Sequence, residues 1–127
     1  MSRTVIRTDR GPRAIGPYSQ AVVSDGWVYV SGQIPLDPAT GRMVDGGITE
    51  QTERALANLT GILEAAGSSA SRVLRATVYL VDMGDFEAMN AVYARYFSSD
   101  PPARVCVAVA ALPRGARVEI DAVARTG

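Results

Sequence analysis

The chain has 127 residues, of which 47% are hydrophobic and 20% are charged, and its formal net charge is zero. That balance is typical of a globular protein, and no apolar run approaches the roughly 20 residues of a membrane-spanning helix. Because the first residues hold no apolar leader and the basic residues are dispersed, we expect one cytoplasmic domain over residues 1–127, with neither a membrane nor a nucleic-acid partner.

Missing residue types exclude several classes of chemistry. The sequence has no histidine, which is the commonest general base and metal ligand, and all 13 basic residues are arginine. Without lysine there is no Schiff-base nucleophile, P-loop or lysine-bound pyridoxal cofactor. The single cysteine, Cys106, cannot form an internal disulfide or a paired-cysteine metal site. We therefore expect neither a metal nor a cofactor.

The first predicted elements are two strands, at 21–23 and 27–31. They flank the pair Asp25-Gly26, and an Asp-Gly turn between β-branched and aromatic residues is a strong hairpin signal. Prolines and glycines then mark a loop over 35–47, where the chain changes direction before the next element.

A helix is predicted over 48–66. Apolar residues recur there every three or four positions, and polar residues, Asn58 among them, fall mainly on the opposite side. Thr49 is the expected N-terminal cap, and Gly67 stands where a left-handed residue usually ends a helix.

The second half of the chain is predicted to contain three strands and one helix. Residues 72–81 are β-branched and aromatic with apolar positions on both faces, which indicates a central strand covered on each side. A helix is predicted over about 84–97 from an apolar stripe that consists of Phe86, Met89, Tyr93 and Phe97. The last two strands are expected at 103–110 and 117–124.

This order of elements predicts the fold class. Strand-rich ends around two helices indicate an α+β fold in which both helices cover one face of the sheet. The opposite face then needs a cover, and a partner subunit is the simplest candidate.

Strand alternation places the residues that could carry chemistry. Arg104 and Cys106 share one face of their strand, and Val105 points to the other. Arg104 is either an edge-strand arginine with its head in water or a fork that binds a carboxylate. Cys106 is most simply a small buried residue, because no histidine could activate its thiol.

The last strand and the second helix offer further candidates. Glu119 shares a face with Arg117 and Asp121, which is either a solvated polar face or the place where Glu119 activates a water molecule. Asn90 interrupts the apolar stripe of the second helix, as a hydrogen-bond hub or as a site-lining group. Tyr18 follows a Gly-Pro bend, where an aromatic ring often only packs.

Six segments of the chain, taken in order, resemble the RidA/YjgF family of reactive-intermediate imine deaminases. They are AIGPYSQA at 14–21, SGQIPLDPATG at 31–41, QT…NL…ILEAAG across 51–67, YLVDMGDFEAMNAVYARYF at 79–97, PAR-V-CV at 102–107 and ALPRGARVEIDAVA at 111–124. The resemblance covers nearly the whole chain, and six ordered blocks are far more specific than any one of them.

The resemblance implies a fold, an assembly and a site. The fold is a chorismate-mutase-like mixed sheet with two helices on one face, and the assembly is a homotrimer with clefts between subunits. Arg104, the arginine of PAR, would bind the substrate carboxylate, and Glu119, the glutamate of VEI, would position water. The other implied pocket residues are Tyr18, Ser31, Gly32, Asn90 and Cys106.

One position departs from the family pattern. Val105 stands where Ser, Thr or Ala is common after PAR. Because Val105 alternates away from Arg104, we expect it to affect packing rather than chemistry.

The implied activity is hydrolytic deamination without a cofactor. The substrates would be 2-aminoacrylate and 2-aminocrotonate with their tautomers 2-iminopropanoate and 2-iminobutanoate, and the products 2-oxo acids and ammonia. The alternatives are an endoribonuclease or translation inhibitor, and a non-enzymatic chaperone or metabolite-binding protein. Zero net charge and the lack of histidine disfavour RNA cleavage. A pure carboxylate binder needs Arg104 alone, so the presence of Glu119 favours catalysis.

Strand geometry bears on how Arg104 and Glu119 could meet. If the last two strands formed a simple hairpin, residue 108 would face Glu119, and Arg104 would lie about 13 Å away along the strand. A small 2-imino acid cannot bridge that span. We therefore expect the Arg104 and Glu119 of one site to come from different chains.

Overall fold

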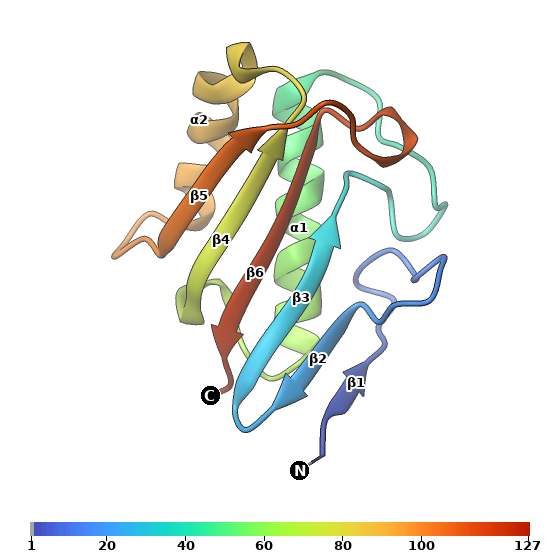
Figure 1. Cartoon of the computed structure of the whole chain (residues 1–127), viewed down its shortest axis with the longest axis vertical. Coiled ribbons are helices and arrows are strands. Elements are labelled where there is room, and N and C mark those ends of the chain that lie inside the picture. Colours follow the sequence, from blue (N-terminus) through green and yellow to red (C-terminus); the bar gives the residue numbers. More distant parts are fainter. Residues whose placement is uncertain (1) are drawn as a thin grey trace.

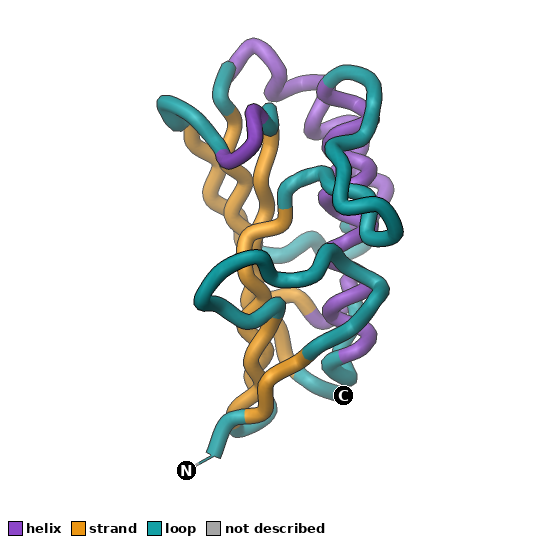
Figure 2. The backbone as a smooth tube through the Cα atoms, turned by 90° about the vertical axis from the view of Figure 1, so that its right-hand side faces the viewer, coloured by secondary structure: helices purple, strands orange, loops and turns teal. Residues whose placement is uncertain are grey.

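A computed structural model describes residues 2–127 as a six-stranded mixed sheet with two α-helices (Figure 1). The elements are β1 (Thr4–Ile6), β2 (Ala21–Ser24), β3 (Trp27–Gln33), α1 (Ile48–Ala65), β4 (Val73–Leu80), α2 (Phe86–Tyr96), β5 (Ala103–Ala108) and β6 (Val118–Arg125). The strand order is β1-β2-β3-β6-β4-β5, and only the β4–β5 pair is parallel. Both helices cover one face (Figure 2), which confirms the α+β prediction. Strand β1 was not predicted, because three residues are too few to show alternation.

The hairpin of β2 and β3 forms as predicted. Asp25 and Gly26 both have positive φ, at 53° and 79°, as a two-residue hairpin turn requires. Strand β3 also carries a bulge against β6. Val30 pairs with Ala122 and Gln33 with Ile120, so β3 has one residue more than β6 over this interval.

Helix α1 begins with a different cap from the one predicted. Gly47, not Thr49, occupies the N-cap position, and the Glu50 side chain accepts a hydrogen bond from the Gly47 backbone N–H at 2.8 Å. Thr49 lies within the first turn instead. Gly67, with φ of 82°, follows the helix end in the expected left-handed conformation.

Asn58 lies on the buried side of α1, so its placement among the solvent-facing residues was wrong. Its side chain is fully buried, and its Nδ2 donates to the carbonyl oxygens of Leu36 at 2.9 Å and Ile34 at 3.3 Å. Buried carbonyl groups need donors, and the periodicity of a helix does not reveal where a distant loop supplies them. This contact ties the loop after β3 to α1.

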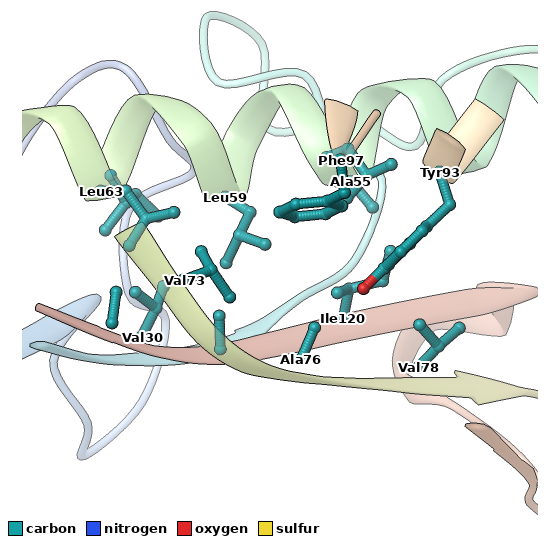
Figure 3. Packing of buried hydrophobic residues seen from close by; sticks show 14 of the residues in the cluster. Val30, Ala55, Leu59, Leu63, Val73, Ala76, Val78, Tyr93, Phe97 and Ile120 are labelled. Atoms are coloured by element: carbon teal, nitrogen blue, oxygen red, sulfur yellow. The ribbon is translucent and has the colours of Figure 1, made fainter. Parts of the chain in front are cut away.

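The core lies between the sheet and the helices. Figure 3 shows Leu59 and Leu63 of α1 directed toward the sheet, which carries Ala76 and Ile120, while Val78 lies below Tyr93 of α2. Each fully buried aliphatic side chain of this kind contributes roughly 1.5–3 kcal/mol to stability. Within residues 2–127, neither helix is both long and apolar enough to cross a bilayer.

The other face of the sheet, which we call the open face, has no helix over it. Strand β4 buries only one side, through Val73, Ala76, Val78 and Leu80, so the predicted cover on both sides is absent from the single chain. Its Leu74 is 45% exposed. Large apolar side chains of three strands remain exposed here, namely Trp27, Tyr29, Leu74, Val105 and Val107.

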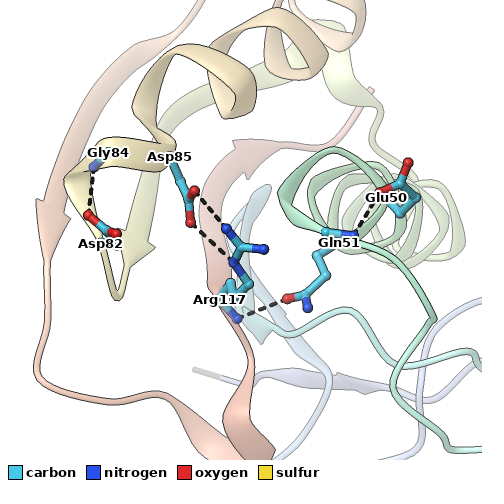
Figure 4. Close-up of polar contacts among 7 residues, drawn as sticks. Glu50, Gln51, Asp82, Gly84, Asp85 and Arg117 are labelled. Atoms are coloured by element: carbon cyan, nitrogen blue, oxygen red, sulfur yellow. Dashed lines mark hydrogen bonds and ion pairs between the residues drawn. The ribbon is translucent and has the colours of Figure 1, made fainter.

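A polar cluster fixes the start of β6 to both helices (Figure 4). Arg117, just before β6, donates to the Asp85 carboxylate through Nη2 at 2.8 Å and Nε at 3.3 Å, and its backbone N–H donates to Gln51 Oε1 at 2.9 Å. Arg117 therefore does not share a polar face with Glu119, as alternation had suggested. Asp85 belongs to a short 3-10 turn, Met83–Asp85, which delays α2 by two residues relative to the predicted start.

Candidate active site

A cavity of about 410 Å³ brings together four of the predicted site residues. Tyr18, Ser31, Gly32 and Glu119 all line it. Its remaining walls come from the loops before β2, after β3 and before β6, which lie on the same side of the molecule in Figure 1. The cavity has the size of a small-molecule site.

Gly32 allows Glu119 to enter this cavity. Residues 31 and 32 form the bulge of β3, and Glu119 lies on the open face of the neighbouring strand. A Cβ added to Gly32 would lie 1.9 Å from Glu119 Oε2, closer than any real contact, so a side chain here would displace the carboxylate. The bulge and the glycine together therefore set the Glu119 carboxylate against the backbone of β3.

The surroundings of Glu119 make its carboxylate more basic. Burial raises the pKa of Glu119 above the ordinary value, and the negative charge of Asp121, two residues along the same face, raises it further. Asp121 accepts a hydrogen bond from Tyr79 Oη at 3.0 Å. A raised pKa suits a carboxylate that takes a proton from water and then returns it.

Backbone contacts hold Tyr18 and Ser31 at the cavity wall. The Tyr18 N–H donates to the Gly16 carbonyl at 2.8 Å, which closes the Gly-Pro bend, and the Tyr18 side chain stays 51% exposed. Ser31 Oγ donates to the Ser19 carbonyl at 2.6 Å. Tyr18 is therefore not a packed turn aromatic, and its ring remains accessible to a ligand.

The remaining candidates, Arg104, Asn90 and Cys106, form a second group at the β5 edge. Arg104 Nη1 donates to Asn90 Oδ1 at 2.7 Å. The guanidinium carbon lies 4.8 Å from the centroid of the Tyr93 ring and 5.6 Å from that of Phe86. One hydrogen bond and two ring faces thus orient the guanidinium, and within residues 2–127 its other N–H groups have no hydrogen-bond partner.

Cys106 keeps its proton in this setting. Burial raises the pKa of the Cys106 thiol, and the positive charge of Arg104 acts in the opposite direction. A protonated thiol is a poor nucleophile, which agrees with the reading of Cys106 as a lining residue. Val105 points to the open face, where it is 44% exposed, so the expectation that it turns away from Arg104 is confirmed.

The two groups lie on opposite faces of the sheet. Arg104 contacts α2, whereas Glu119 lies on the open face. Strand β4 separates their strands, and Glu119 pairs with Tyr79 while Arg104 pairs with Ala76, so their Cα atoms are about 14 Å apart at ordinary strand spacings. The simple hairpin considered for the last two strands is therefore wrong. No small 2-imino acid can contact both groups within one chain.

Sequence reasoning missed two charged residues of the cavity, Arg13 and Arg114. Both lie in loops, where neither strand alternation nor helical spacing applies. The sequence did offer one signal, the Pro-Arg-Gly turn shortly before the strand of Glu119. In the structure this turn is left-handed, since Arg114 has φ of 59° and Gly115 has φ of 73°. Over residues 2–127, no group of three or more Cys, Asp or Glu side chains could hold a metal ion.

Known proteins and a family model match this chain over almost its whole length. The family model described as Endoribonuclease L-PSP matches residues 8–126. A 2-iminobutanoate/2-iminopropanoate deaminase of Capra hircus is 52% identical over 125 residues, which are 98% of this chain and 91% of that protein.

Two solved structures share the fold. RidA from an Antarctic Psychrobacter species has a TM-score of 0.93 and 42% identity over 96% of this chain and 98% of its own. Escherichia coli TdcF with bound serine has a TM-score of 0.93 and 38% identity over 98% of this chain and 99% of its own. The chain therefore belongs to the RidA/YjgF/L-PSP family.

Proposed function

We propose that this protein hydrolyses 2-iminopropanoate and 2-iminobutanoate, with their enamine tautomers 2-aminoacrylate and 2-aminocrotonate, to 2-oxo acids and ammonia. The observation that carries the proposal is Glu119, a carboxyl group of raised pKa on the wall of a cavity of small-molecule size. The goat relative that is named for this reaction supports the choice of substrates. TdcF, which was solved with serine, supports a ligand that carries a carboxylate beside a nitrogen-bearing carbon.

The chemistry needs few groups. Arg104 holds the substrate carboxylate with its free N–H groups and fixes the pose of the molecule. Glu119 takes a proton from water as the water oxygen bonds to the imine carbon. Glu119 passes this proton to the nitrogen, which gives a carbinolamine. Glu119 then takes the hydroxyl proton and transfers it to the amino group as the carbon–nitrogen bond breaks, so that a 2-oxo acid and ammonia leave. Imines hydrolyse in water unaided, so a site without metal or cofactor is sufficient for the acceleration required.

The proposal includes a homotrimer in which each site lies between two subunits. Arg104, Asn90 and Cys106 of one subunit would complete the cavity that holds Glu119 of the next. The separation of the two groups by the sheet supports this arrangement, as do the exposed Trp27 and Tyr29 of the open face, which a neighbour would cover. In a cyclic assembly every subunit supplies its Arg104 to the cavity of one neighbour and receives the Arg104 of the other neighbour at its own Glu119.

An ammonia-release assay tests the function directly. Threonine dehydratase supplies 2-aminocrotonate, which decays to 2-oxobutanoate and ammonia without help. We expect this protein, added at catalytic concentration, to raise the rate of ammonia release well above that spontaneous rate. A folded protein that leaves the rate unchanged would remove the deaminase proposal.

Hybrid oligomers are expected to recover activity that their parents lack. Arg104→Ala and Glu119→Gln proteins should each be inactive alone, whereas co-refolded mixtures contain some interfaces with both residues intact. Ammonia release should then return in part. Mass spectrometry gives the fraction of hybrids, and confirmed hybrids without any recovered activity would show that both residues act from the same chain.

Asp121 is expected to set the pH range of activity. Glu119 works as a base when it is ionised, so activity falls as the pH drops through its raised pKa. Asp121→Asn removes a negative charge while still accepting the Tyr79 hydrogen bond, so it lowers the pKa of Glu119 and should move the acid limb of kcat/KM to lower pH. The variant Asp45→Asn, at an exposed loop position, serves as the control. An unmoved limb in Asp121→Asn would contradict the coupling.

The Cys106 thiol is expected to be dispensable for chemistry. Cys106→Ser should retain substantial turnover, because the thiol is protonated and only lines the site. Steady-state rates of the purified variant provide the measurement, with circular dichroism as the check on folding. Complete loss of turnover in a folded Cys106→Ser protein would indicate thiol chemistry instead.

RNA cleavage, the activity named by the family model, fits these residues less well. It needs an acid and a base that act on either side of a phosphate, and Glu119 is the cavity residue with a shifted pKa. A chain of zero net charge also lacks the long-range attraction that draws proteins to nucleic acid.

A further inference from the structure

A smaller cavity of about 220 Å³ adjoins the one that holds Glu119. The two cavities share five lining residues, which are Pro12, Arg13, Ile15, Leu36 and Arg114. The loop over 38–41 closes the smaller one on its far side. The candidate active site therefore extends beyond the space that a three- or four-carbon imine would fill.

Two guanidinium groups without partners stand on the wall between these cavities. Within residues 2–127, neither the Arg13 nor the Arg114 side chain forms a hydrogen bond or an ion pair. Both side chains are exposed, and other arginines such as Arg42 also lack a partner among these residues, so what distinguishes Arg13 and Arg114 is their position on the shared wall of the two cavities. Arg13 and Arg114 are also the charged residues that line the smaller cavity.

The charges around the site are unbalanced for a substrate with one carboxylate. Glu119 is the acidic residue that lines the larger cavity, Arg13 and Arg114 line the same cavity, and the proposed function adds the Arg104 guanidinium of a neighbouring subunit. A monoanionic substrate thus leaves an excess positive charge in the site. A dianionic substrate brings the three guanidinium groups and the one carboxylate to neutrality.

We infer that the smaller cavity is a second anion subsite, in which Arg13 and Arg114 bind the distal carboxylate of a dicarboxylic 2-imino acid such as 2-iminosuccinate or 2-iminoglutarate. The inference rests on the proposed function, because the imine carbon still has to lie beside Glu119. The reaction is the same hydrolysis: water adds to the C=N carbon, the carbon–nitrogen bond breaks, and ammonia and a dicarboxylic 2-oxo acid leave. The planar guanidinium fork is well matched to a carboxylate.

Turnover of paired substrates tests the subsite. Amino-acid oxidases acting on aspartate or glutamate supply the dicarboxylic imines, and 2-iminobutanoate is the reference. The measured quantity is the ratio of kcat/KM for the dicarboxylic imine to kcat/KM for 2-iminobutanoate. Arg13→Gln and Arg114→Gln should each lower this ratio about tenfold, which is the contribution of one charge-assisted hydrogen bond. The double variant should lower the ratio further.

Arg42→Gln is the matched control, since it removes an exposed positive charge near the same loop without lining either cavity. Its ratio should equal that of the unaltered protein. An unchanged ratio in the double variant, or an equal fall in Arg42→Gln, overturns the subsite.

Binding of the 2-oxo acids separates failure of the subsite from failure of the deaminase proposal. Calorimetric titration should show 2-oxoglutarate bound more tightly than 2-oxobutanoate, and the double variant should abolish the difference. If neither imine is turned over but this difference holds, the deaminase proposal fails and the anion subsite stands. If 2-iminobutanoate is turned over but 2-oxoglutarate binds no more tightly than 2-oxobutanoate, the subsite is wrong and the deaminase stands.

Discussion

Replacing Glu119 with glutamine should lower kcat for 2-iminobutanoate by about 10²- to 10⁴-fold, the usual contribution of a positioned general base. Glutamine keeps the shape of the side chain and its capacity for hydrogen bonds, but it cannot take a proton from water. Affinity for 2-oxobutanoate should persist, because Arg104 still holds the carboxylate. Steady-state kinetics and calorimetric titration of the same preparation measure both quantities.

A second variant tests the position of the carboxylate rather than its identity. Gly32→Ala leaves Glu119 in the chain but places a Cβ where the carboxylate lies. Its kcat should fall toward that of Glu119→Gln. Glu87→Gln, at an exposed position of α2, controls for the general loss of an acidic group. Wild-type turnover in Glu119→Gln would remove the general-base assignment of Glu119.

Replacing Arg104 with lysine should lower kcat/KM by about a hundredfold, within the range found when one partner of a buried charge pair is changed. Lysine keeps the positive charge, but its three N–H donors diverge from a single nitrogen, so it cannot bond to Asn90 and also match two carboxylate oxygens as a planar fork does. It also loses the planar contact with Tyr93. The loss should appear in the affinity for 2-oxobutanoate as well as in turnover, unlike that of Glu119→Gln.

The control for this change is Arg95→Lys, which alters an exposed arginine of α2 whose carboxylate contact is long, at 3.9 Å. It should leave kcat/KM unchanged. Wild-type rates for Arg104→Lys would mean that charge alone holds the substrate, and the bidentate carboxylate fork would have to be abandoned.

The sequence predicted the structure correctly where a pattern among neighbouring residues determines it. Alternation with period two assigned Arg104 and Glu119 to their strand faces, and the Asp25-Gly26 pair located the hairpin. Strand pairing is different, because partners distant in sequence decide it. No local pattern revealed that β4 lies between β5 and β6, and this insertion is what puts Arg104 and Glu119 on separate strands with a third between them.

The same reasoning explains which side chains were misplaced. Asn58 reads as polar and therefore solvent-facing, but the carbonyl groups of a distant loop draw it into the interior. Arg117 lies one residue outside its strand, where alternation no longer holds and the Asp85 carboxylate determines its direction. Arg13 and Arg114 belong to loops, whose shape depends on the whole fold.

The bulge in β3 means that the site is encoded in a residue count as well as in residue identities. Deleting one residue at 31–32 would let β3 and β6 pair without interruption, which favours the regular hydrogen-bond ladder of the sheet. Gln33 would keep its partner Ile120 and its buried side, but the recess beside Glu119, to which the extra residue contributes, would close. At this one point an uninterrupted ladder and the recess that holds the carboxylate are alternatives, so the geometry of the site depends on the number of residues in β3.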